Sequence, residues 1–195
     1  MSVKVAMIGA GSIGFTRKLV QDILTVPELE DTEFAFTDIS KRNLEMVYQL
    51  VLRDIKANNR PAKLTATTNR RKALDGADYV FSVVRVGGLE AFKLDIDIPL
   101  KYGIDQCVGD TLCAGGIMYA QRGIPALLDF CKDIREVASK DALFMNYSNP
   151  MAMLTWACNG VRTLGLCHGT KGAARLKTKS VAELRRLAAK RRKQK

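Results

Sequence analysis

Two short polar motifs in the last third of the chain contain side chains that can bind ligands or transfer protons. The motif NYSNP begins at Asn146, and the motif CHG begins at Cys167. The amides of Asn146 and Asn149 can donate to and accept from a nicotinamide or a sugar hydroxyl. Cys167 and His168 are ligands that suit a divalent transition metal. The structural alternative is that the asparagines are turn residues and that the cysteine is a small buried hydrophobe.

A glycine-rich turn near the start of the chain indicates a cofactor site. The turn is GAGSIG at residues 9–14, between a largely apolar run at residues 3–8 and a helix-compatible segment at residues 15–25. A strand, a glycine turn and a helix N-terminus in this order form a dinucleotide-binding fingerprint. The free N–H groups and the positive end of the helix dipole would hold the phosphates of the cofactor.

Each glycine of this turn has an expected role. Gly9 permits the sharp turn, Gly11 lets the backbone approach a pyrophosphate, and Gly14 lets the helix and the strand pack closely. The cofactor-binding residues predicted in the turn are Gly9, Ala10, Gly11, Ser12, Ile13 and Gly14.

Asp38 follows the second predicted strand, at residues 33–37. Its distance from the glycine turn is close to the ~20-residue spacing at which an acidic residue binds the ribose hydroxyls of the cofactor. A carboxylate at this position favours NAD over NADP, because it would repel a 2′-phosphate. The structural alternative is an aspartate that caps a helix or a turn.

The elements that must position these residues alternate between strands and helices. The apolar run DYVFSVV in the fourth strand suits a buried parallel strand. This alternation predicts an α/β fold with a Rossmann-like, doubly wound and mostly parallel sheet. The glycine-rich segment 107–116 is expected to be a loop, which either closes over a ligand or only connects elements. The expected strands are residues 3–8, 33–37, 63–67, 78–84, 142–146 and 161–166, and the expected helices are residues 15–25, 40–58, 72–74, 97–102, 117–139 and 151–158.

The formal net charge of +11 is concentrated at one end of the chain. Residues 171–195 contain 11 Lys or Arg and one acidic residue, which leaves residues 1–170 with 20 basic and 19 acidic residues. The sequence therefore predicts a nearly neutral cofactor-binding domain at 1–170 and a basic tail at 171–195. The tail is expected to be helical or disordered, and it is the one segment for which binding of nucleic acid or a membrane surface is considered.

Composition also indicates the compartment. Five cysteines without a CxxC pair argue against a disulfide framework. No apolar run approaches the ~20 residues of a membrane span, and no signal peptide is recognised. A cytoplasmic protein with reduced thiols and no membrane partner is expected.

Four motifs in order along the chain resemble glycoside hydrolase family four. They are GAGSIGFT at 9–16, DTLCAGGI at 110–117, NYSNPMAM at 146–153 and GLCHG at 165–169. The resemblance implies NAD and a divalent metal, usually manganese (Mn²⁺), as cofactors for glycoside cleavage. The chemistry it implies is oxidation of the sugar at C3, elimination of the glycosidic oxygen, addition of water and return of the hydride.

Site residues follow from the resemblance position by position. Asn149 matches the substrate asparagine and Cys167 the metal-ligand cysteine, whereas Asn146 is a cofactor-binding candidate from the chemistry of its amide. His168 is the candidate proton donor, and a histidine there resembles the α-galactosidase (melibiase) branch, which acts on unphosphorylated α-glycosides. The full-length family is expected to form homo-oligomers.

The sequence also departs from the family pattern. Chains of the family are roughly twice as long, with a second metal-ligand histidine and a tyrosine base further on. Here His168 is the single histidine and no tyrosine follows Tyr147. The expectation is a truncated copy with weak or no activity, in which the C-terminal substrate domain is absent and the tail is a frameshift product.

Two other functions remain open from the residues. A 2-hydroxy-acid dehydrogenase would use His168 as base and Arg85 for the substrate carboxylate, but it leaves the NYSNP and CHG motifs unexplained. A non-enzymatic NAD-binding protein would use the basic tail to bind nucleic acid.

Overall fold

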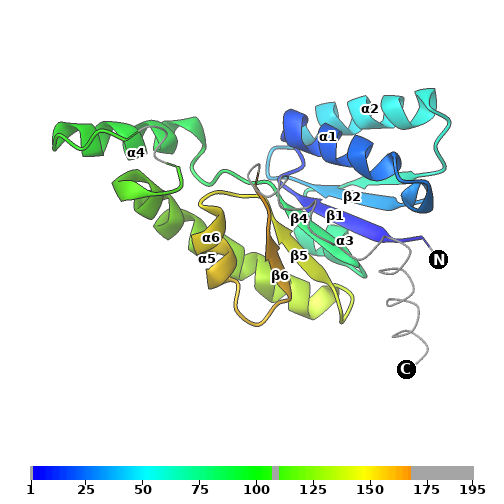
Figure 1. Ribbon diagram of the computed structural model, residues 1–195. Coiled ribbons are helices and arrows are strands. Elements are labelled where there is room, and N and C mark those ends of the chain that lie inside the picture. Colours follow the sequence, from blue (N-terminus) through cyan, green and yellow to red (C-terminus); the bar gives the residue numbers. More distant parts are fainter. Residues whose placement is uncertain (1, 107–109, 168–195) are drawn as a thin grey trace.

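The computed structural model describes residues 2–106 and 110–167 (Figure 1). Strands and helices alternate along these residues, as predicted. The strands are β1 (Lys4–Ile8), β2 (Glu33–Thr37), β3 (Lys63–Ala66), β4 (Tyr79–Ser82), β5 (Leu143–Asn146) and β6 (Thr163–Gly165). The helices are α1 (Ile13–Leu24), α2 (Lys41–Ala57), α3 (Arg70–Leu74), α4 (Gly88–Lys101), α5 (Cys113–Val137) and α6 (Met151–Ala157), with a short 3₁₀ helix, η1, at Pro27–Leu29.

The six strands form one parallel sheet in the order β3-β2-β1-β4-β5-β6. In the centre of the sheet, Ala6 of β1 lies opposite Ala35 of β2 on one side and Val80 of β4 on the other. The strand order reverses between β1 and β4, so the crevice for a ligand lies outside the carboxyl ends of these two strands. The predicted Rossmann-like, doubly wound sheet is confirmed.

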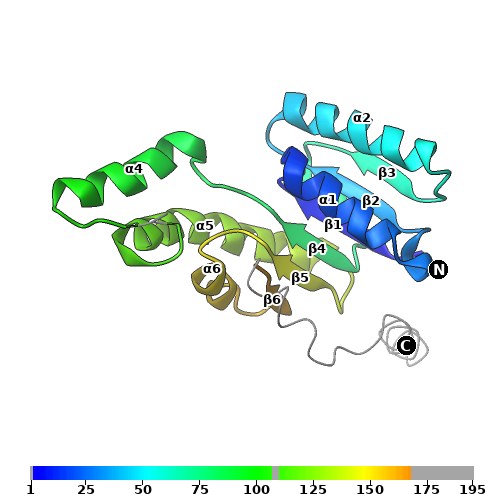
Figure 2. The same cartoon turned by 45° about the horizontal axis from the view of Figure 1, so that its top comes forward.

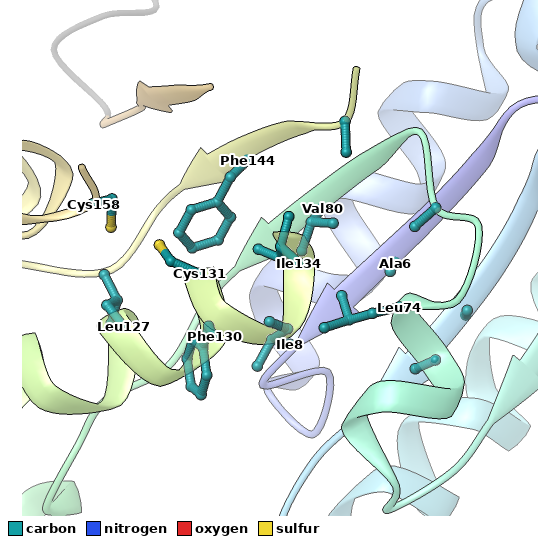
Figure 3. Close-up of a cluster of buried hydrophobic side chains, with 14 of the residues drawn as sticks. Ala6, Ile8, Leu74, Val80, Leu127, Phe130, Cys131, Ile134, Phe144 and Cys158 are labelled. Atoms are coloured by element: carbon teal, nitrogen blue, oxygen red, sulfur yellow. The ribbon is translucent and has the colours of Figure 1, made fainter. Parts of the chain in front are cut away.

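Both faces of the sheet are covered by helices, and successive residues of each strand face opposite sides. Val5 and Met7 of β1 pack in the cluster that α1 and α2 cover. Ala6 and Ile8 pack in the second cluster, which α3, α5 and α6 cover (Figure 3). Figures 1 and 2 show α1 and α2 on one side of the sheet and α5 and α6 on the other.

The first turn of α2 is capped by a side chain. Ser40 is the N-cap, and its Oγ accepts a hydrogen bond from the backbone N–H of Asn43 at 3.3 Å. This cap lies two residues after Asp38, so the start of the helix is adjacent to the predicted ribose-binding residue.

The connection between β4 and β5 differs from the prediction. Helix α4 begins at Gly88, well before the expected residues 97–102, and α5 begins at Cys113. Gly115 and Gly116 therefore lie in a helix and not in a loop. Gly116 serves a close approach, because a Cβ there would lie 2.6 Å from the carbonyl carbon of Thr111. Figures 1 and 2 show that α4 extends away from the sheet and packs along α5.

None of the helices within residues 2–106 and 110–167 has the length and apolar composition needed to cross a membrane. His168 and the predicted tail at 171–195 lie outside the described residues, so the domain boundary at residue 170 remains a prediction.

Candidate functional site

The glycine turn lies at the carboxyl end of β1, inside the crevice of the sheet. The backbone N–H groups of Gly9 and Ala10 both donate to the carbonyl of Thr37, at 2.9 and 3.1 Å. Gly9 has φ +85°, and a Cβ there would lie 2.8 Å from Cγ1 of Val84 and 3.0 Å from the carbonyl of Val83. A side chain would be strained by both the backbone conformation and the neighbouring chain. The predicted turn role of Gly9 is confirmed.

Gly11 makes room for the carboxylate of Asp38. Its backbone N–H donates to Oδ2 of Asp38 at 2.8 Å, and a Cβ on Gly11 would lie 2.8 Å from the same oxygen. The other oxygen, Oδ1, accepts from the N–H of Ser40 at 2.8 Å. Asp38 thus links the turn to the start of α2, and it combines the turn-forming role with a position at the mouth of the crevice. The approach of Gly11 to a pyrophosphate remains a prediction, whereas its approach to Asp38 is a direct requirement of the fold.

The start of α1 is open to solvent. Ser12 is its N-cap, but the Ser12 side chain makes no capping hydrogen bond to the helix N–H groups. Ile13 is exposed, and no atom lies within 4 Å of a Cβ placed on Gly14. The prediction that Gly14 allows close packing of helix and strand is therefore wrong, because this position faces open space. An exposed helix N-terminus without a side-chain cap is suited to binding an anion.

The side chain of Asn146 is buried and forms hydrogen bonds within the NYSNP loop. Its side chain is 0% exposed. The Nδ2 donates to the carbonyl of Ser148 and to Oγ1 of Thr155, both at 3.2 Å, and Oδ1 accepts from the N–H of Ser148 at 3.0 Å. The predicted direct contact between Asn146 and the cofactor disagrees with this geometry, because the buried amide is used by hydrogen bonds within the loop and to α6.

Ser148 attaches the same loop to β4. Its Oγ lies 3.0 Å from Oγ of Ser82 and accepts from the N–H of Val84 at 3.0 Å. These contacts hold the carboxyl ends of β4 and β5 together, next to the turn residue Gly9, whose neighbour is also Val84. The sequence-based prediction missed Ser148, although its place in the motif NYSNP could have drawn attention to it.

Tyr147 packs on the opposite side of this loop. Its ring centroid lies 6.0 Å from that of Phe15 and 6.4 Å from that of Phe81, which connects the loop to α1 and β4. Burial raises the pKa of Tyr147, and the negative charges of Asp22 and Cys167 add to this effect. The phenol is therefore neutral at physiological pH.

Asn149 is oriented by a contact from a distant loop. Its Nδ2 donates to Oδ2 of Asp110 at 2.9 Å, and Nη2 of Arg85 lies 3.9 Å from the same oxygen. These three residues come from the NYSNP loop, the segment before α5 and the segment after β4. Asp110 was missed as a site residue, although it begins the DTLCAGGI motif.

The guanidinium of Arg85 packs against two aromatic rings, one of which also contacts Arg122. The Arg85 guanidinium lies 4.6 Å from the ring centroid of Phe92 and 5.2 Å from that of Tyr119. Arg122 lies over the same tyrosine ring and forms an ion pair with Asp95, which is fully buried. The hydrogen bond to Asp95 raises the pKa of Arg122, and the charge of the carboxylate contributes further.

Cys167 lies beside the NYSNP loop and is half-buried. The preceding residue, Leu166, donates its N–H to the carbonyl of Asn146 at 2.9 Å, which continues the pairing of β6 with β5. Within residues 2–106 and 110–167, no three His, Cys, Asp or Glu side chains come together as a metal site. The described residues therefore do not form a metal centre on their own. The roles of Cys167 as metal ligand and of His168 as proton donor remain predictions.

Comparison with known proteins identifies the family. Residues 4–183 match the model described as "Family 4 glycosyl hydrolase". The matched range extends past the last recognised motif, GLCHG at 165–169, into the predicted basic tail. An alpha-galactosidase of Rhizobium meliloti (strain 1021) is 64% identical over 176 residues, which are 89% of this chain and 36% of that protein. An alpha-galactosidase of Bacillus subtilis (strain 168) is 38% identical over 86% of this chain and 40% of its own length.

The fold agrees with this assignment. The structure of the 6-phospho-beta glucosidase from Thermotoga maritima with manganese, NAD+ and glucose-6-phosphate superposes with a TM-score of 0.77 at 28% identity, over 89% of this chain and 42% of that one. The chain thus spans about two fifths of the length of these relatives. The sequence match over most of the chain and the shared fold together show that it belongs to family 4 of the glycosyl hydrolases.

Proposed function

We propose that this chain is the NAD-binding part of a family 4 glycosidase that acts on α-galactosides or related unphosphorylated α-glycosides. The observation that carries the proposal is the hydrogen-bonded pair of Gly11 and Asp38 at the point where the strand order reverses. The relatives named alpha-galactosidase support the substrate class. A 2-hydroxy-acid dehydrogenase is disfavoured, because the family assignment accounts for the NYSNP and CHG motifs.

The residues of the crevice fit a dinucleotide. Gly9 and Gly11 leave no space for side chains, the start of α1 is open for phosphate, and the half-buried Asp38 can accept hydrogen bonds from ribose hydroxyls. NAD bound here would accept a hydride from the sugar and later return it. The negative charge of Asp38 favours NAD over NADP.

The sugar would lie outside the ends of β5 and β6. Asn149 would bind a sugar hydroxyl, while Asn146 and Ser148 keep its loop in place. Cys167 would supply one thiolate to a divalent metal such as Mn²⁺, and His168 would donate a proton. Ligands and a base from beyond this sequence would complete the centre.

We expect the chain as given to bind NAD without measurable glycoside turnover, because it has a single histidine and no tyrosine after Tyr147. A cytoplasmic location is also proposed, in which the cysteines would stay reduced. A homo-oligomer is proposed for the full-length protein.

Thermal unfolding and a nitrophenyl α-galactoside assay test this proposal together. Saturation with NAD at 100 times its Kd would stabilise the fold by about 2.7 kcal/mol and, at roughly 2–4 °C per kcal/mol for a domain of this size, raise the Tm by about 5–11 °C. The same protein with NAD and Mn²⁺ should release no nitrophenol above the blank. Absence of any NAD-dependent shift would contradict the proposed cofactor site, and robust hydrolysis would contradict the proposed need for further residues.

A further inference from the structure

The contact between Asp110 and Asn149 decides which end of the Asn149 amide faces the site. We infer that Asp110 is a positioning residue, which turns Asn149 so that its carbonyl oxygen recognises a hydroxyl group of the sugar. The inference rests on the proposed function, since it takes Asn149 as a substrate contact, and it adds the polarity of that contact and the residue that sets it.

The polarity follows from the chemistry of the pair. An ionised carboxylate can only accept hydrogen bonds, so the atom of Asn149 that lies 2.9 Å from Oδ2 of Asp110 must be the NH₂ group. The carbonyl oxygen, Oδ1, then points to the opposite side of the amide. Within the part of the chain that the structure describes, the Asn149 side chain makes this one hydrogen bond. Oδ1 is thus available as an acceptor for a ligand hydroxyl.

The carboxylate of Asp110 is itself held in place. Its side chain is 17% exposed, its Oδ1 accepts from Oγ1 of Thr111 at 3.2 Å, and Nη2 of Arg85 lies 3.9 Å from Oδ2. Arg85 in turn lies against the rings of Phe92 and Tyr119. Because the hydrogen bond from Thr111 and the nearby positive charge of Arg85 restrict the carboxylate, it can orient Asn149 before a ligand arrives.

This arrangement predicts selectivity for a hydrogen-bond donor. A carbonyl acceptor binds a hydroxyl group and cannot bind a ketone, ether or fluorine at the same sugar carbon, because those groups also only accept. If Asn149 pointed its NH₂ group at the sugar, a hydroxyl group and a ketone or ether could all accept from it, and this selectivity would be lost.

Three variants separate these alternatives. Asp110→Asn allows the amide of Asn149 to rotate, Asn149→Asp places two carboxylates against each other, and the double variant D110N/N149D restores a donor–acceptor pair with the partners exchanged. In the double variant the outer oxygen of residue 149 still accepts, so it should still bind a hydroxyl. Asp97→Asn is the matched control, because Asp97 has the same charge and forms an exposed pair with Lys93 on α4.

The first readout is the side-chain NH₂ signal of Asn149 in ¹⁵N NMR spectra of the whole chain. We expect Asp110→Asn to shift this signal and to speed its exchange with solvent roughly tenfold or more, because a hydrogen bond to a charged group is lost. Asp97→Asn should leave the signal unchanged. An Asn149 signal that is the same in the wild type and in Asp110→Asn would overturn the positioning role, whatever the outcome with NAD.

The second readout is the Kd of methyl α-D-galactopyranoside for the NAD-saturated chain. Each single variant should weaken binding roughly tenfold, and the double variant should remain within about threefold of the wild type. A folded double variant that binds NAD normally but has lost the galactoside would show that Asn149 donates, and would overturn the inference. A wild-type chain that binds NAD but no galactoside would overturn sugar recognition by Asn149, whereas failure to bind NAD would count against the proposed function itself.

Discussion

Replacing Arg122 with methionine should destabilise the contact between α4 and α5. The guanidinium donates to both oxygens of Asp95, at 3.1 Å from Nη1 and 2.5 Å from Nη2, and its Nε donates to the carbonyl of Val86 at 3.0 Å. The side chain of Asp95 is 1% exposed. Methionine retains much of the volume of arginine but removes the charge, so the Asp95 carboxylate would be left buried without its partner.

The expected cost is large relative to the stability of a domain. Breaking a buried ion pair by removing one partner costs about 3–5 kcal/mol, against a typical total of roughly 5–15 kcal/mol. The cost has an upper limit here, because α4 lies away from the sheet and can separate from α5 to let water reach Asp95. Part of the cost would then appear as easier local opening of α4, and the free energy of global unfolding would fall by less.

Urea denaturation followed by circular dichroism measures the global change, and hydrogen exchange of peptides from α4 measures the local one. We expect Arg122→Met to lower the free energy of unfolding, to speed exchange in α4, or both. The variant D95L/R122M, which removes both charges, should be more stable than Arg122→Met alone. Lys18→Met, which breaks an exposed pair with Asp22, is the control and should change little. If Arg122→Met matched the wild type in stability and in α4 exchange, the assignment of Asp95 as a buried, charged anchor would be refuted.

Four further predictions follow from the same structure. Gly9→Ala should destabilise the fold by about 1–3 kcal/mol because of its positive φ, whereas Gly14→Ala should be neutral or stabilising by about 0.5–1 kcal/mol, as measured by thermal unfolding. Burial alone would raise the pKa of Asp133, but hydrogen bonds from Arg70 and Arg71 outweigh it and lower the pKa below its usual value. The stability that Asp133 contributes is therefore complete above about pH 4 and lost as the pH falls through its lowered pKa. In urea denaturation, the difference in free energy of unfolding between the wild type and Asp133→Asn should be large at pH 7 and should disappear under strongly acidic conditions. Iodoacetamide should modify the exposed Cys113 well before the buried Cys131 and Cys158, by peptide mass spectrometry; equal rates in the folded chain would contradict the described core. Asp38→Asn should weaken NAD binding roughly tenfold and reduce the preference for NAD over NADP, by fluorescence titration; an unchanged preference would exclude Asp38 as the ribose contact.

Most of the sheet was predictable because β1, β2, β4 and β5 are short and largely apolar, whereas the edge strand β3 (KLTA) is mostly exposed. The predicted second strand, 33–37, matches β2 at both ends, and the position of Asp38 followed from it. Gly9 was equally accessible to prediction, since a glycine directly after a buried strand indicates a sharp turn.

Helix α4 was only partly predictable, for a physical reason. Its apolar residues do not form one stripe, because Leu89 and Leu94 are exposed while Phe92 is half-buried against Arg85. The glycine that precedes it (Gly87), the glycine that begins it (Gly88) and the two at the start of α5 are of a type common in loops. Their actual roles depend on neighbours from other segments, such as the backbone of Thr111 beside Gly116.

The polar contacts of the site depend on the folded chain in the same way. The motif NYSNP predicted a ligand-binding loop, but only the structure distinguishes Asn146, which is used inside the loop, from Asn149, which is turned toward Asp110. The two residues have the same chemistry and lie three positions apart. Their difference comes from the course of the backbone and from a carboxylate 39 residues away along the chain.

Calorimetric titration of the chain with NAD and with NADP tests the central claim most directly. Saturable binding of NAD with one site per chain, and clearly weaker binding of NADP, is the predicted result, because Asp38 would repel the 2′-phosphate. Equal affinity for the two cofactors would contradict the role of Asp38, and no heat of binding with either would contradict the assignment of the crevice between β1 and β4 as a dinucleotide site.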